Sequence, residues 1–89
     1  MKSLRLTTRF RRDLKRIERR GLKFNRLTSI VDALRADRTL PPRNRDHTLT
    51  GDWQDCRECH IAPDWLLIYQ TTDEEVILIR TGSHADLFE

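Results

Sequence analysis

The sequence predicts an α+β fold in which two N-terminal helices pack together on one face of a small, mainly antiparallel β-sheet, in the order β-α-α-β-β-β. Three observations support it: apolar residues recur with helical spacing up to about residue 38, Pro41-Pro42 ends that pattern, and short strand-like segments follow. Two helices followed by a run of strands are typical of an antiparallel sheet with its helices on one face. Because the 89 residues contain no repeat or linker, we expect one domain, residues 1–89.

The first half of the chain is expected to form one strand and two helices. Residues 2–6 alternate between polar and apolar side chains, as a strand does. A helix capped by Thr7 or Thr8 and ended by Gly21 follows, with an apolar face of Phe10, Leu14 and Ile17. A second helix is predicted from residue 24 to about residue 38, with an apolar stripe of Leu27, Ile30, Val31 and Leu34.

The second half is expected to form a strand meander. The predicted strands are a short one around residues 47–53, broken by Gly51, and three longer ones at residues 56–61, 65–71 and 75–81. Pro63-Asp64 and Thr72-Asp73-Glu74 supply the turns between the longer strands. We expect the helical side of the sheet to be lined by Leu66, Ile68, Ile77 and Ile79, although a slip of one residue would invert this choice.

Charge is distributed very unevenly along the chain. Residues 1–45 contain 15 of the 17 Lys and Arg residues but only four of the 14 acidic residues. A cluster of this kind favours a surface that contacts a polyanion, because phosphate contacts release counterions without any base recognition. A solvated helix face and a surface for an acidic protein partner are the alternatives. The candidate contacts to an RNA or ribosomal backbone are Arg9, Arg11, Arg12, Lys15, Arg16, Arg19 and Arg20.

Hydropathy indicates that the protein does not enter a membrane. No segment approaches the roughly 20 apolar residues of a membrane span, and residues 1–6 lack the apolar core of a signal peptide. We therefore expect a cytoplasmic location.

Residues 56–60, Cys-Arg-Glu-Cys-His, match the C-x-x-C-H pattern of c-type haem attachment. Haem attachment at this pattern requires export of the protein and a helix around the motif. Here no signal peptide is expected, and the segment is predicted to be a strand. A zinc site is also disfavoured, because the adjacent Cys59 and His60 point to opposite faces of a strand. We expect two reduced, buried or partly buried thiols, and neither a metal nor a cofactor.

The acidic half contains a set of side chains suited to cleavage of a phosphodiester. Imidazole titrates near neutral pH and can remove a 2′-OH proton or protonate a leaving 5′-oxygen. A guanidinium can stabilise the added negative charge, and aromatic rings can stack on an unpaired base. Each residue also has an ordinary structural explanation, such as a turn, a core position or a surface ion pair. The candidates are His47, His60 and His84 with Asp64, Arg80, Trp65 and Phe88.

Three blocks of sequence resemble one known family. They are H-x-L-x-G-x-W at residues 47–53, H-x-x-P-D-W at residues 60–65 and R-T-G-S-H-A-x-L-F at residues 80–88. Together they resemble the YafQ branch of the RelE/ParE toxin superfamily, and the likeness in element order covers essentially the whole chain. The resemblance implies a toxin of a type II toxin–antitoxin pair that acts as a ribosome-dependent endoribonuclease and cuts mRNA in the ribosomal A site.

The resemblance also implies roles for individual residues. His47, His60, Asp64 and His84 would form the catalytic group, supported by Arg80 and Phe88. We expect His84 to act as general acid, Asp64 or His60 as base, and Arg80 to brace the phosphate. The implied partners are the ribosome, mRNA and a cognate antitoxin with a DNA-binding dimer domain and an extended tail, so that contact with DNA would be only indirect.

Two other activities remain open at this point. A ParE-like toxin would inhibit DNA gyrase, but binding a topoisomerase requires no acid–base pair. A non-catalytic RNA-binding module would use the basic helices alone, and its toxicity would not depend on the histidines.

Overall fold

One five-stranded sheet organises residues 1–88, which are the residues that the structure, a computed structural model, describes. The strands follow the order β1-β5-β4-β3-β2, and only the β1–β5 pair is parallel. Their bounds are β1 Ser3–Leu6, β2 His47–Thr48, β3 Arg57–Ala62, β4 Trp65–Thr71 and β5 Glu75–Gly82. The predicted α+β class and element order are confirmed, and β2 is the short additional strand.

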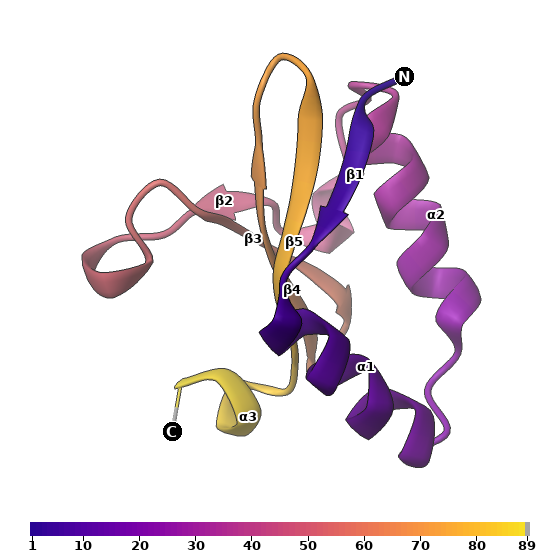
Figure 1. The fold of residues 1–89 in the computed structure, drawn as a ribbon. Coiled ribbons are helices and arrows are strands. Elements are labelled where there is room, and N and C mark those ends of the chain that lie inside the picture. The colour runs from indigo at the N-terminus through magenta and orange to yellow at the C-terminus, as the bar shows by residue number, and fades with distance from the viewer. Residues whose placement is uncertain (89) are drawn as a thin grey trace.

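Two helices, α1 (Thr8–Arg19) and α2 (Phe24–Arg35), share one core against the sheet (Figure 1). The hydroxyl of Thr7 caps α1 by accepting a hydrogen bond from the Phe10 N–H at 3.0 Å. The second helix stops short of the expected end near residue 38, because Asp37 adopts a left-handed conformation with φ 59°. No helix within residues 1–88 is long and apolar enough to cross a bilayer.

The face of the sheet that packs against the helices is the opposite of the one predicted. Its residues in the helical core are Cys59, Ile61, Trp65, Leu67, Tyr69, Val76 and Leu78. Leu66, Ile68 and Ile79 instead join a second cluster with Cys56 and Leu87, so the prediction that they face the helices is wrong. It is wrong for Ile77 as well, because this residue alternates with Val76 and Leu78 along β5.

The physical reason for this error is that β4 is covered on both faces. Its residues Trp65 to Tyr69 are all buried, since residues 49–56 and the C-terminal helix cover the face opposite α1 and α2. A strand that is apolar on both faces carries no alternation from which the helical face can be chosen.

The sequence analysis did not predict the short helix α3 (His84–Phe88) after β5 (Figure 1). Two reciprocal hydrogen bonds begin it: the Asp86 N–H donates to the Ser83 hydroxyl at 3.1 Å, and the Ser83 N–H donates to the Asp86 carboxylate at 2.9 Å. This is a capping box, and Ser83-His84-Ala85-Asp86 has its sequence signature. The irregular segment before β3 contains two single turns of 3-10 helix, η1 (Pro42–Asn44) and η2 (Gly51–Trp53).

Gly82 joins β5 to α3 with φ +155°, and a Cβ added there would lie 2.8 Å from an Asp86 carboxylate oxygen. We expect Gly82→Ala to lower the free energy of unfolding by about 2 kcal/mol, because both the backbone and the capping carboxylate must shift. Gly21→Ala is the control, since φ is +72° there but nothing lies within 4 Å of the added carbon. It should cost about 1 kcal/mol. Urea denaturation measures both, and equal losses would contradict the role given to the Asp86 contact.

Candidate active site

A buried carboxylate, Glu58, lies between two of the three histidines. The β2–β3 register places His47 opposite Glu58, and the two-residue period of β3 places His60 on the same face as Glu58. The Oε1 atom of Glu58 lies 3.5 Å from Nε2 of His47 and 3.8 Å from Nε2 of His60. At Nδ1, the ring of His47 is 2.6 Å from the carbonyl oxygen of Arg45. Since a carbonyl only accepts, Nδ1 donates this bond and is the protonated nitrogen.

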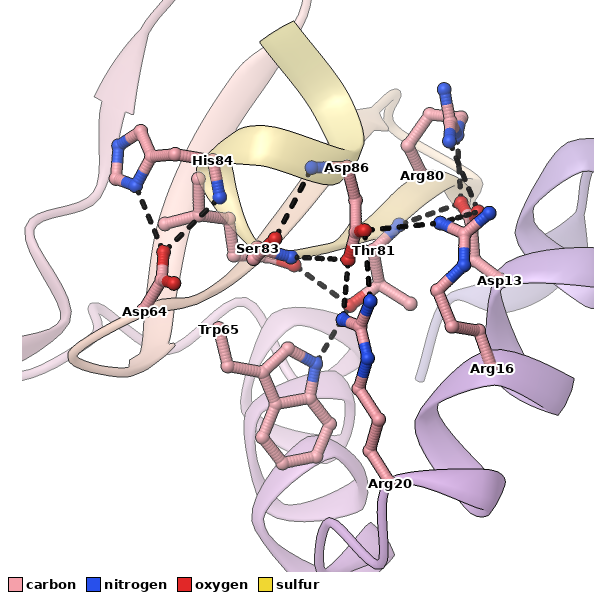
Figure 2. A network of polar contacts seen from close by, with 11 residues as sticks. Asp13, Arg16, Arg20, Asp64, Trp65, Arg80, Thr81, Ser83, His84 and Asp86 are labelled. Atoms are coloured by element: carbon pink, nitrogen blue, oxygen red, sulfur yellow. Dashed lines mark hydrogen bonds and ion pairs between the residues drawn. The ribbon is translucent and has the colours of Figure 1, made fainter. Parts of the chain in front are cut away.

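The third histidine, His84, is held by the turn between β3 and β4. The carboxylate of Asp64 accepts the backbone N–H of His84 at 3.1 Å and lies 3.2 Å from Nδ1 of its ring (Figure 2). These two hydrogen bonds hold the pKa of Asp64 below its usual value, and the bond from the His84 backbone has the larger effect. Asp64 therefore stays ionised and orients the ring, and Nε2 is the nitrogen left for a substrate.

The two histidine groups form one continuous surface. The ring centroids of His60 and His84 are 6.0 Å apart, and Phe88 lies 6.2 Å from His84. Trp53, from η2, packs edge-on against Phe88 at 6.2 Å. The structure thus brings together five of the predicted site residues, His47, His60, Asp64, His84 and Phe88.

Arg80 lies away from this surface, in a buried ion pair with Asp13 of α1. Its Nε and Nη2 donate to the two carboxylate oxygens at 2.7 and 3.0 Å, and the N–H of Thr81 donates to the same carboxylate at 3.1 Å (Figure 2). These bonds raise the pKa of Arg80 above its usual value. The side chain of Arg80 is only 10% exposed, so its guanidinium binds Asp13 of α1 and is not accessible to a ligand.

Two of the basic residues predicted to face RNA also make intramolecular pairs. Arg20 forms a bidentate pair with Asp86 at 2.6 and 3.0 Å, and Arg16 lies 3.5 Å from the same carboxylate (Figure 2). Both guanidiniums anchor α3 to α1. The exposed basic side chains of α1 for which no ion pair is found within residues 1–88 are Arg9, Arg11, Arg12, Lys15 and Arg19.

Trp65 is not positioned to stack on a base. Its side chain is in the helical core, is 3% exposed, and donates from Nε1 to the hydroxyl of Thr81 at 2.9 Å. Trp65 was predicted to stack on a base or to support the site, and its burial and its hydrogen bond to Thr81 favour support of β4 and β5. The half-buried Trp53, which was not among the predicted site residues, is the tryptophan beside Phe88.

Sequence analysis also missed Glu58, which touches two of the site histidines. The signal was present, because Glu58 and His60 are two residues apart on a predicted strand and therefore share a face. The competing C-x-x-C-H pattern directed the interpretation to the thiols instead.

Cys56 and Cys59 are both free and buried, as predicted. Burial raises the pKa of the Cys59 thiol to about 12, so it remains protonated at neutral pH. Within the described residues 1–88, no group of three or more His, Cys, Asp or Glu side chains is arranged to hold a metal ion.

The sequence matches one protein-family model over residues 2–89, that of the "bacterial toxin of type II toxin-antitoxin system, YafQ". The chain belongs to the YafQ family. It is 38% identical to the mRNA interferase toxin YafQ of Escherichia coli K12 over 80 residues, 89% of this chain and 87% of that one.

Solved structures of bacterial toxins have the same fold. In the crystal structure of the E. coli DinJ-YafQ toxin-antitoxin complex, a matching chain is 34% identical with a TM-score of 0.91, over 99% of this chain and 98% of that one. A metal-bound toxin from Helicobacter pylori is 37% identical with a TM-score of 0.92, over 99% and 100% of the two chains. The β-α-α-β-β-β framework with its short C-terminal helix is therefore matched by known structures over nearly the whole chain.

Breaking the buried pair between Asp13 and Arg80 should destabilise the protein strongly. We expect Asp13→Asn to lower the free energy of unfolding by about 3 kcal/mol, because it leaves a buried guanidinium without its counter-charge. Asp32→Asn, on the exposed face of α2, is the control and should change stability by less than about 0.5 kcal/mol. Thermal and urea unfolding measure both, and a similar small effect for the two variants would rule out the role given to the pair.

The ion pair between Arg20 and Asp86 should make the stability of the protein pH-dependent. Hydrogen bonds from Arg20, and then from Ser83, hold the pKa of Asp86 well below its usual value of about 4. A depressed carboxyl pKa contributes stability that is present above that usual value and is lost as the pH falls below it. Because Arg20 is 44% exposed, Asp86→Asn should cost only about 1 kcal/mol at pH 7. The difference from wild type should shrink towards pH 3 in urea titrations, whereas a difference that grows on acidification would contradict the assignment.

Proposed function

We propose that this YafQ-family protein is a ribosome-dependent endoribonuclease that cuts mRNA in the A site by attack of the 2′-oxygen on the adjacent phosphate. The observation that carries the proposal is the pairing of His60 and His84. Their rings face one surface 6.0 Å apart, and each has a carboxylate beside it, Glu58 or Asp64. Two imidazoles so placed supply one proton acceptor and one proton donor for a single phosphodiester.

The geometry favours His84 as general acid and His60 as general base. Asp64 is the alternative base, but its carboxylate is engaged by His84 and its depressed pKa makes it a weak proton acceptor. In the proposed reaction His60 takes the 2′-OH proton, the 2′-oxygen bonds to phosphorus and the P–O5′ bond breaks. His84 protonates the leaving 5′-oxygen. The products are a 2′,3′-cyclic phosphate and a 5′-hydroxyl.

The remaining site residues act on the position of the substrate. His47 is tethered at Nδ1 to the Arg45 carbonyl, and we assign it to orientation of the scissile phosphate. Phe88 is 43% exposed and suits stacking on an unpaired base, with Trp53 packed behind it. Phosphate bracing by Arg80 would require the guanidinium to leave Asp13, and we therefore assign Arg80 mainly to holding α1 against β5.

Likeness to the E. coli mRNA interferase toxin supports cleavage of message, and the DinJ-YafQ complex supports a cognate antitoxin as protein partner. We assign the unpaired basic residues of α1 to backbone contacts with the ribosome. Cleavage of free RNA should be weak, because the ribosome supplies the in-line geometry that a short site cannot impose. Contact with DNA would occur only through the antitoxin.

The test is cleavage of message on translating ribosomes by purified variants. We expect His84→Ala and His60→Ala to lower the rate by about 10²- to 10⁴-fold, the usual contribution of a general acid or base. Asp32→Asn should cleave like wild type, and so should toxin treated with a chelator that is removed before the ribosomes are added, because both proton transfers are assigned to imidazoles. Wild-type cleavage by His84→Ala would refute its assignment. Intact message together with inhibited gyrase would indicate a ParE-like activity, and unchanged toxicity of both histidine variants would indicate a non-catalytic RNA-binding module.

A further inference from the structure

A groove of about 900 Å³ runs beside the histidine surface, between α2 and the outer edge of β3. One wall is α2, the opposite wall is the segment from Leu40 to Arg45, and the floor includes Ile61. His60 is one of the lining residues of the groove and its ring belongs to the histidine surface, so the two features meet at His60, at the edge of β3.

The lining of this groove is basic. Arg26 enters it from α2, and Arg43 and Arg45 enter it from the opposite wall, while none of its lining residues is acidic. All three arginines are exposed, and within residues 1–88 none of their side chains is found in an ion pair. By contrast, Arg16 and Arg20 are both committed to Asp86. The groove therefore presents unpaired guanidiniums, whereas two of the guanidiniums of α1 and its C-terminal cap are neutralised by Asp86.

The wall that carries Arg43 and Arg45 is held rigidly. The Asn44 amide, buried between these two arginines, donates to the His60 carbonyl at 2.8 Å. Asp46, next along the chain, accepts a hydrogen bond from the Tyr69 hydroxyl at 2.5 Å. Both anchors lie on the sheet, so the backbone that carries the two arginines is fixed relative to the site.

Arg45 links the groove directly to His47. Its backbone is left-handed, with φ 47°, a conformation that residues other than glycine adopt only at an energetic cost. That conformation allows its carbonyl to accept the ring N–H of His47 while its side chain lines the groove. Strained backbone of this kind persists where the surrounding structure requires it, which is often at a binding site.

We infer that this groove holds the backbone of the single-stranded RNA on one side of the scissile phosphate, with Arg26, Arg43 and Arg45 contacting successive phosphates. The inference deepens the proposed function and rests on it for the identity of the strand. Guanidiniums without an acidic counterpart suit a polyanion, and phosphate contacts need no recognition of base sequence. Because the groove and the histidine surface meet at His60, RNA bound in the groove would reach the cleavage site there. An acidic segment of an antitoxin is the competing occupant.

The experiment measures binding of a short fluorescent RNA whose 2′-O-methyl groups prevent 2′-oxygen attack. We expect the triple variant Arg26→Gln, Arg43→Gln, Arg45→Gln to bind it at least about tenfold more weakly at low salt. The slope of log K against log salt concentration should become shallower by roughly 2, as expected for three lost contacts to a single strand. The charge-matched control is Arg5→Gln, Lys23→Gln, Arg38→Gln, three exposed basic residues outside both the groove lining and α1, which should change oligonucleotide binding by less than about twofold.

Further readouts separate the groove from the chemistry and from folding. On ribosomes the groove variant should need more toxin or message for half-maximal cleavage, while its single-turnover rate at saturation stays within about threefold of wild type. The single variant Arg43→Gln, in an exposed turn, should show a smaller loss of the same kind without affecting thermal unfolding. Oligonucleotide binding equal to wild type, or a loss confined to antitoxin binding, would overturn the inference. If the groove binds RNA but wild type cuts no message, the proposed nuclease function fails and the groove assignment stands.

Discussion

The carboxylate of Asp13 accepts three hydrogen bonds from one short stretch of β5, two from Arg80 and one from the backbone of Thr81. Because all three bonds are buried, they determine how α1 lies across the end of β5. Later turns of α1 then place Arg16 and Arg20 beside Asp86, which begins α3. The position of His84 therefore depends on a contact made in the middle of α1, through the ion pairs Asp13–Arg80 and Arg20–Asp86 (Figure 2).

The division of the chain into a basic half and an acidic half has a different meaning in the folded protein from the one that composition suggests. Arg16 and Arg20 neutralise the Asp86 carboxylate of the acidic half, and this pairing builds the site instead of binding a ligand. Among the arginines without an ion pair in residues 1–88, one group lies along α1 and another lies around the groove beside His60. Net charge alone cannot separate these roles, because it contains no information on which carboxylates lie nearby.

Most of the fold followed from local patterns, and the parts that did not are those decided by tertiary contacts. Thr7, Gly21 and Pro41-Pro42 mark helix ends through backbone chemistry that acts within a few residues. By contrast, Leu66 and Ile68 were assigned to the wrong face, because a second layer covers β4.

The site was predictable to the extent that its residues act through their own chemistry. The histidines, Asp64 and Phe88 come together as the sequence blocks indicated. Arg80 has the right chemistry to bind a phosphate, but it forms an ion pair with Asp13 instead. Asp13 is 67 positions away in the sequence, so no local pattern could predict this pair. Glu58 was within reach through its two-residue spacing from His60. The groove arginines were not, since only the packing of α2 beside β3 places them together.

The parallel pairing of β1 with β5 has a kinetic consequence. Ser3 and Glu75 are register partners, so the sheet is closed by segments from opposite ends of the sequence. Such long-range closure makes folding slow and cooperative, because the entropy of the intervening loop is lost before the contacts form. The helices have no surface to cover until β3, β4 and β5 have assembled, and His60 and His84 have no fixed separation before then. A partly folded chain would thus have neither the anchored helices nor the paired imidazoles, and the protein should gain its activity in a single step, together with its native structure.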